Sequence, residues 1–154
     1  MSHIDNVTRI KIVYDALEEL AESVVFVGGA TVSLYADRTT EEVRPTGDID
    51  ILVEVITHLG YAEIEEKLRA KGFINDQESG VICRYKIQGV IVDIMPTSEK
   101  VLGFSNRWYV PGFANSIDYK LNEKYIIQIF SPVYFLASKL EAFKNRGAGQ
   151  WNYK

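Results

Sequence analysis

Two carboxylates at the start of an apolar segment are the residues of this sequence best suited to chemistry. Asp48 and Asp50 flank Ile49 and precede the apolar residues 51–53. On a β-strand, side chains two residues apart point to the same face, so we expect the two carboxylates to share a site. Neighbouring anions repel, which raises one pKa or requires a cation, and Mg²⁺ is the cation we expect beside carboxylates and phosphates. The simpler alternative is a solvated strand end that begins with two acidic residues.

A third carboxylate, Asp93, lies among the otherwise apolar residues 90–95. An aspartate inside a buried strand is costly unless it is paired or bound to metal. If this strand neighbours the strand of the first pair, three carboxylates converge in the layout that holds two metal ions, activates a hydroxyl and binds a triphosphate. The alternative is a structural salt bridge from Asp93 to Arg84 or Lys86.

A glycine pair, Gly28 and Gly29, separates a predicted strand over residues 24–27 from a predicted helix over 30–35. Such a turn lets backbone N–H groups approach an anion, with the helix dipole behind them. The turn is not a P-loop, because no Gly-Lys-Ser/Thr follows it. Arg44, in the polar loop further on, is a second candidate phosphate ligand, although loop arginines are usually solvated.

The last predicted helix, over residues 132–145, carries an apolar stripe that we expect to face the core. The stripe consists of Leu136, Leu140 and Phe143, with Phe135 at its edge. Lys139 falls within this stripe, and a cation on an inward face is costly unless it meets an anion. Lys139 is therefore a candidate ligand for a nucleotide phosphate or for the acidic cluster; the alternative is that it reaches past the edge of the core to solvent.

These residues must be positioned by a mixture of strands and helices. We predict further helices over 6–21 and 61–70, and further strands over 49–55, 81–87, 90–95, 117–121 and 125–130. Gln88 and Gly89 separate two of these strands and predict a hairpin. Residues 103–116 are expected to form an ordered loop. The fold class is therefore α/β (α+β), a mixed twisted sheet flanked by helices, in one domain over residues 1–154.

Composition limits the class of protein. The chain has 154 residues, of which 47% are hydrophobic and 25% charged, which is typical of globular proteins. The net charge of −4 disfavours a protein that binds nucleic acid through non-specific phosphate contacts. The single cysteine, Cys83, excludes an internal disulfide and predicts a cytoplasmic location. No apolar run approaches the roughly 18 residues of a membrane helix, so we expect no membrane partner.

The glycine pair, the segment Thr46-Gly47-Asp48-Ile49-Asp50-Ile51 and the segment Val92-Asp93-Ile94 together resemble the signature of the DNA polymerase β-like nucleotidyltransferase superfamily. Within it, the spacing from the glycine pair to the Asp-x-Asp motif and the segment 138–146 are similar to the AbiEii/MenT-type toxin nucleotidyltransferases. The resemblance covers about residues 24–146. It implies the nucleotidyltransferase fold, and an enzyme that moves an NMP group from an NTP to an acceptor hydroxyl.

The resemblance also implies roles for individual residues. Asp48 and Asp50 would hold the metal ions, two Mg²⁺, and Asp93 would complete the site at the acceptor hydroxyl. Gly28 and Gly29 would cradle the nucleotide phosphates. The remaining assignments concern Lys139, which would be the lysine typical of the branch, and Thr31 or Ser33, which would supply the hydroxyl of the Gly-Ser found in many members.

The resemblance extends to partners. It favours a tRNA or protein acceptor over a small molecule, and it suggests the toxin of a toxin–antitoxin or abortive-infection system with an antitoxin partner. The branch usually continues into a further helical region, which we expect this chain to lack. The alternative function is a catalytically inactive nucleotide-binding or partner-binding module of the same fold.

Overall fold

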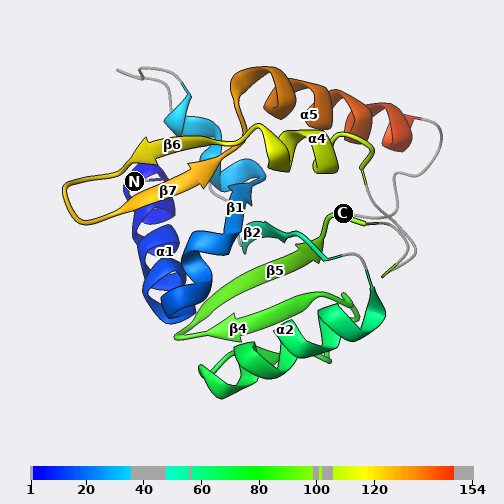
Figure 1. Ribbon diagram of the computed structural model, residues 1–154. Helices are drawn as coiled ribbons and strands as arrows, with labels where there is room; N and C mark the ends of the chain where they lie inside the picture. The colour runs from blue at the N-terminus through cyan, green and yellow to red at the C-terminus, as the bar shows by residue number, and fades with distance from the viewer. Residues whose placement is uncertain (1, 36–47, 56, 99–100, 102–105, 148–154) are drawn as a thin grey trace.

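The computed structural model describes residues 2–35, 48–55, 57–98, 101 and 106–147 (Figure 1). In this part of the chain, seven strands form one mixed sheet: β1 (Val24–Val27), β2 (Asp48–Val53), β3 (Ile74–Asn75), β4 (Arg84–Ile87), β5 (Val90–Pro96), β6 (Ile117–Lys120) and β7 (Ile126–Ile129). The described helices are α1 (Ser2–Leu17), α2 (His58–Ala70), α4 (Tyr109–Ala114) and α5 (Pro132–Gly147), with two 3-10 helices, η1 (Glu18–Ser23) and η2 (Gly29–Leu34).

The strand order across the sheet is β3-β4-β5-β2-β1-β7-β6. The central strand β2 runs parallel to β5 and antiparallel to β1, while β1 runs parallel to β7. The predicted hairpin is confirmed, as β4 pairs with β5, and the predicted strands β6 and β7 also pair with each other in antiparallel. Gln88 and Gly89 both have positive φ, 49° and 81°, as a tight two-residue hairpin turn requires. The predicted mixed sheet flanked by helices is therefore confirmed.

The alternation of side chains along the strands creates two unequal apolar layers. On one face, Ile49 and Ile51 of β2 join a large core with side chains of α1, η1 and α2. On the other face, Leu52 joins a small cluster that α4 and α5 cover. Asp48 and Asp50 are four and two residues before Leu52, so they belong to the face with the small cluster.

The first helix begins and ends four residues earlier than the sequence predicts, over 2–17 instead of 6–21. α1 ends at Leu17, and residues 18–23 form the 3-10 helix η1 instead of continuing to residue 21 as α-helix. The break is at Glu18, whose φ of +55° ends the α-helical geometry. Glu18 and Glu19 then both accept hydrogen bonds from the Lys71 ammonium group, which follows α2. A contact distant in sequence therefore accompanies this boundary. The predicted helix over 30–35 is likewise a 3-10 helix, η2.

Three further elements differ from the prediction. Residues 109–114, expected in a loop, form the helix α4, although Pro111 and Gly112 lie inside it. A side chain at Gly112 would meet the ring of Phe130 at 2.8 Å, so the glycine permits the close packing of α4 on the sheet. The strand expected from residue 81 begins only at Arg84, and the short strand β3 at its edge was not predicted.

The expectation that the apolar stripe of α5 faces the core is wrong. Four apolar side chains of this helix are exposed: Val133 (70%), Leu136 (61%), Leu140 (66%) and Phe143 (60%). The helix packs instead through Tyr134 and Phe135, which contact the small cluster. Tyr134 and Phe135, rather than the exposed apolar stripe, therefore orient α5 on the sheet.

Membrane-spanning helices were sought among the described residues. None of the helices there combines the length and the apolar character that crossing a bilayer requires.

Candidate metal-binding site

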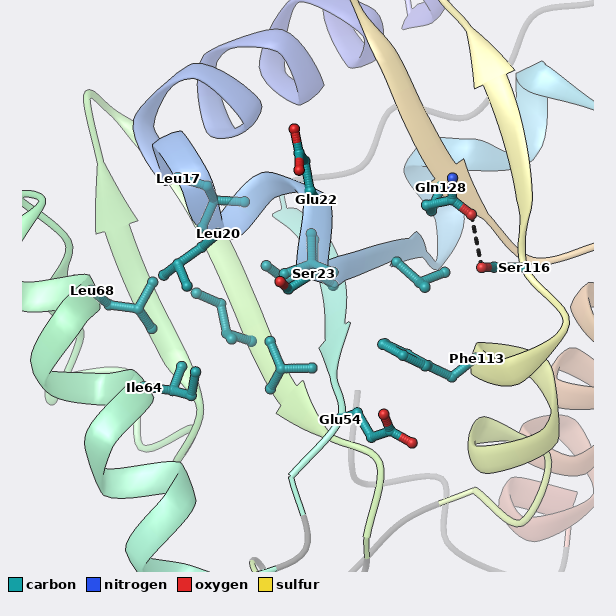
Figure 2. A pocket seen from close by; sticks show the side chains of 15 residues that line it. Leu17, Leu20, Glu22, Ser23, Glu54, Ile64, Leu68, Phe113, Ser116 and Gln128 are labelled. Carbon is teal, nitrogen blue, oxygen red and sulfur yellow. Dashed lines mark hydrogen bonds between the residues drawn. The ribbon is translucent and has the colours of Figure 1, made fainter.

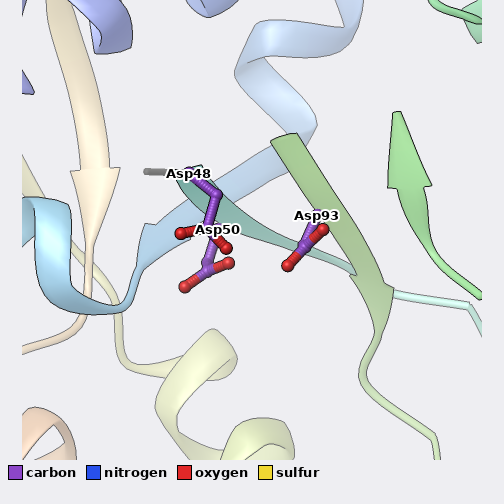
Figure 3. A group of neighbouring side chains, drawn as sticks. All are labelled: Asp48, Asp50 and Asp93. Carbon is purple, nitrogen blue, oxygen red and sulfur yellow. The ribbon is translucent and has the colours of Figure 1, made fainter. Parts of the chain in front are cut away.

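A single row across the sheet brings the acidic residues together. In the strand register, Val27 of β1 pairs with Asp50, Asp50 pairs with Asp93 of β5, and Asp93 pairs with Arg84 of β4. Asp48 lies two residues before Asp50 on the same strand face. The carboxylates of Asp48, Asp50 and Asp93 each offer an oxygen, and these oxygens lie within 4.8 Å of one another (Figure 3). The predicted convergence of the three carboxylates is confirmed.

Arg84 is the cation that meets this cluster. Its Nε donates to Asp93 Oδ1 at 2.8 Å and its Nη2 donates to Asp93 Oδ2 at 2.9 Å, which makes a two-pronged ion pair. The same Nη2 donates to Asp48 Oδ2 at 3.2 Å. The side chains of Arg84 and Asp93 are only 15% and 10% exposed. The alternative of a salt bridge from Asp93 to Arg84 is therefore confirmed together with the convergence.

The negative charges of the cluster stabilise a bound cation. The hydrogen bonds to Asp93, and then the charges of Asp93, Asp48 and Asp50, raise the pKa of Arg84 above its ordinary value. The guanidinium is therefore always charged. Three carboxylates lie close together here beside the Arg84 guanidinium, and closely spaced carboxylates favour the binding of a divalent cation.

The glycine turn lies directly against the cluster. Gly28 has a φ of +81°, and a Cβ there would collide with the Asp50 carboxylate. Both the conformation and the close approach therefore require glycine. The neighbouring Gly29 begins η2 and is partly buried. The predicted position of the glycine pair beside the carboxylates is confirmed at Gly28; its contact with phosphates stays a prediction.

The two hydroxyl candidates are turned inward. Thr31 Oγ1 donates to the Gly28 carbonyl oxygen at 2.8 Å, and the Thr31 amide donates to the same oxygen at 3.1 Å. Thr31 and Ser33 are both buried. The Thr31 hydroxyl therefore stabilises the glycine turn, and its donated proton is directed to the backbone.

The remaining sequence candidates are placed less closely. Lys139 is exposed on α5, and its ammonium group lies 5.9 Å from the centre of the Phe135 ring. The expectation that it lies on an inward face is wrong, because the stripe to which it belongs faces outward. Arg44 falls outside the described residues.

Sequence reasoning missed Tyr109, the first residue of α4. Burial, and to a smaller extent the negative charge of Asp50, raise the pKa of its phenol to about 12. The phenol is therefore protonated at neutral pH near the acidic cluster. Its ring packs 6.4 Å from that of Phe130. The signal that would have found it is the presence of aromatic residues in the segment 103–116, which was expected to form a loop.

The donor set fits a hard divalent cation. Carboxylate oxygens are the ligands that Mg²⁺ prefers, and the described cluster contains neither histidine nor cysteine ligands that would favour zinc. The absence of a side chain at Gly28 lets the Asp50 carboxylate lie directly against the backbone of the turn. Asp48 and Asp50 are partly exposed, so an ion can reach them. The three residues therefore fit Mg²⁺, with Arg84 as a competing cation.

The structure also contains a cavity, at the end of β1 and β2 that lies away from the carboxylates. This cavity of about 470 Å³ is lined mainly by aliphatic side chains such as Leu20, Val24 and Ile64 (Figure 2). Val24 pairs with Val53, at the opposite end of β1 and β2 from the pair Val27 and Asp50. The cavity is therefore separate from the carboxylates. Its polar lining includes Ser116 and Gln128, which bond to each other.

Comparison with known proteins adds no family assignment: no protein-family model and no curated protein sequence matches this chain.

Proposed function

We propose that the chain is a metal-dependent nucleotidyltransferase, which moves an NMP group from an NTP to an acceptor hydroxyl. The observation that carries this proposal is the convergence of Asp48, Asp50 and Asp93 from two adjacent parallel strands, with oxygens within 4.8 Å of one another. The motif resemblance to the DNA polymerase β-like superfamily supports the same reaction.

The proposed chemistry assigns a role to each part of the site. Asp48 and Asp50 hold Mg²⁺, which when bound neutralises charge on the triphosphate and the leaving pyrophosphate. The acceptor oxygen forms a bond to the α-phosphorus as the bond from that phosphorus to pyrophosphate breaks. Asp93 accepts the proton of the hydroxyl. Gly28 keeps side-chain atoms away from Asp50, so that phosphates can approach the turn.

The resemblance supports a macromolecular acceptor, a tRNA or a protein, rather than a small molecule. It also supports the role of a toxin held in check by an antitoxin. The acidic net charge of −4 favours protein over RNA as the acceptor. Acceptor class is therefore the part of the proposal that the experiment must resolve.

A second candidate function is favoured by the two-pronged bond between Arg84 and Asp93. In this alternative the chain binds a nucleotide with its metal ion but does not transfer it, because the guanidinium occupies both oxygens of the third carboxylate. Binding without transfer is the outcome that identifies it.

The test is transfer of label from each NTP, labelled at the α-phosphate, to separate pools of tRNA, protein and small molecules in the presence of Mg²⁺. We expect label in one pool. The double variant Asp48→Asn, Asp50→Asn removes the metal ligands, so transfer falls by more than about 100-fold. Glu54→Gln, an exposed carboxylate just beyond the same strand, is the matched control and keeps full transfer.

Two results would contradict the enzyme. The first is transfer that survives the double substitution. The second is the absence of label in every pool while Mg²⁺ and NTP together still raise the melting temperature of the wild-type chain, which would establish the binding module instead. No thermal shift and no transfer would remove both candidates.

A further inference from the structure

Arg84 and a divalent ion at this site would need the same oxygen atoms. The guanidinium donates hydrogen bonds to both oxygens of Asp93, at 2.8 and 2.9 Å, and to Oδ2 of Asp48, at 3.2 Å. A metal ion bridging Asp48 and Asp93 would lie in contact with those oxygens and beside the positive guanidinium. Like charges at such short range repel strongly when the groups are mostly buried, as Arg84 and Asp93 are.

The contacts of Arg84 are unequal. Arg84 makes two short hydrogen bonds to Asp93, whose side chain is only 10% exposed. Its single contact to Asp48 is longer, and the Asp48 side chain is 29% exposed. Two-pronged guanidinium–carboxylate pairs are the stronger kind. An arriving metal ion therefore displaces Nη2 from Asp48 more readily than it separates Arg84 from Asp93.

We propose that Arg84 is a resident cation that reserves Asp93, so that a divalent ion is held by Asp48 and Asp50 while Asp93 stays bound to the guanidinium. Arg84 is a positioning residue in this scheme, because it fixes the orientation of Asp93. The inference rests on the metal-binding part of the proposed function, which the enzyme and the binding module share. It also replaces the expectation of two Mg²⁺ positions with one metal position and one guanidinium position.

The test is a double-mutant cycle in Mn²⁺ affinity, measured by calorimetry on the whole chain without nucleotide. In the wild-type background, Asp93→Asn changes the Kd for Mn²⁺ by less than about threefold, because Asp93 does not ligate the ion. Arg84→Gln tightens Mn²⁺ binding by at least about tenfold. In the Arg84→Gln background, Asp93→Asn then weakens binding by at least about tenfold, because Asp93 has become a ligand.

Lys86→Gln is the matched control. Lys86 lies on the same strand face as Arg84, two residues along, and its substitution removes the same charge without touching the carboxylates. We expect it to change the Kd by less than about threefold, since exposed charges at a distance are screened. An effect of Lys86→Gln equal to that of Arg84→Gln would overturn the inference, because general charge rather than the contact would be responsible.

The outcomes separate this inference from the proposed function. If Asp93→Asn weakens Mn²⁺ binding tenfold in the wild-type background, Asp93 is a ligand beside Arg84 and the inference fails while the metal site stands. If the wild-type chain binds no Mn²⁺, the metal site fails and the inference with it. Should Arg84→Gln not fold, as judged by circular dichroism, Arg84→Lys replaces it: this variant keeps the charge but loses the fork, and unchanged affinity and unchanged Asp93 dependence in it would overturn the inference.

Discussion

The β2–β5 strand pair and the helix α5 each carry a polar group on an apolar element, but the two elements use that group differently. On β2 and β5, Asp48, Asp50 and Asp93 lie close together, and Arg84 donates hydrogen bonds to Asp48 and Asp93. On α5, Lys139 lies within an apolar stripe that faces solvent. The same reasoning, that a charge on an apolar face needs a partner, succeeded for the strands and failed for the helix.

The difference lies in what surrounds each element. A central strand has neighbours on both edges and packed layers on both faces, so every side chain on it meets other parts of the protein. A helix at the surface buries only one side, and which side is buried depends on the elements it meets. A charge on a central strand is therefore stronger evidence for a site than a charge on a surface helix.

The largest loss of stability that we expect comes from a substitution on the strands. Arg84→Gln removes the partner of Asp93, a side chain that is only 10% exposed. Leaving a nearly buried charge unpaired costs about 3 kcal/mol in the free energy of unfolding. Urea denaturation measures it, and Mg²⁺ should recover part of the loss because the ion compensates the freed carboxylates.

Lys86→Gln serves as the control for this loss of stability as well. Lys86 is exposed on the same strand, and we expect its substitution to change the free energy of unfolding by less than about 0.5 kcal/mol. A loss below about 1 kcal/mol for Arg84→Gln would mean that the ion pair is weaker than its geometry indicates, and that the strands are no more demanding of charge partners than α5.

Much of the acidic site could be predicted because a strand has a strict period of two. Asp48 and Asp50 had to share a face, and the apolar neighbours of Asp93 required it to find a partner. Even the choice between Arg84 and Lys86 was available. A two-residue turn at Gln88 and Gly89 pairs residue 87 with 90, and therefore residue 84 with Asp93.

What could not be predicted depends on contacts between distant segments. The order of the strands, with β2 between β1 and β5, is set by crossovers that no local pattern records. The orientation of α5 depends on Tyr134 and Phe135 meeting Leu52 and Phe130. The helical period of α5 revealed the stripe correctly, but a period contains no information about which side meets the sheet.

Substitutions at the glycine turn test how closely β2 is packed, and the loss of stability that we expect from them is smaller. Gly28→Ala places a Cβ against the Asp50 carboxylate at a φ of +81°, and we expect a loss of about 2 kcal/mol from strain and displacement together. Gly89→Ala is matched in φ, also +81°, but its Cβ would meet nothing within 4 Å. It should cost about 1 kcal/mol, from the backbone alone. Equal losses would show that Gly28 is needed for its conformation and not for the approach of Asp50.

The smallest effect is expected on α5, where the comparison is most easily overturned. Leu140 is 66% exposed, so Leu140→Ala removes few contacts and should change the free energy of unfolding by less than about 0.5 kcal/mol. Alanine also has a slightly higher helix propensity than leucine, which offsets part of any loss. Phe135→Ala, at the edge of the stripe where the same helix packs on the small cluster, is the control and should cost more than about 1 kcal/mol because the centre of its ring lies 4.5 Å from that of Tyr35. If Leu140→Ala were the more damaging of the two in urea denaturation, the stripe would be the packed face of α5 after all, and Lys139 would return as a candidate ligand for the acidic cluster.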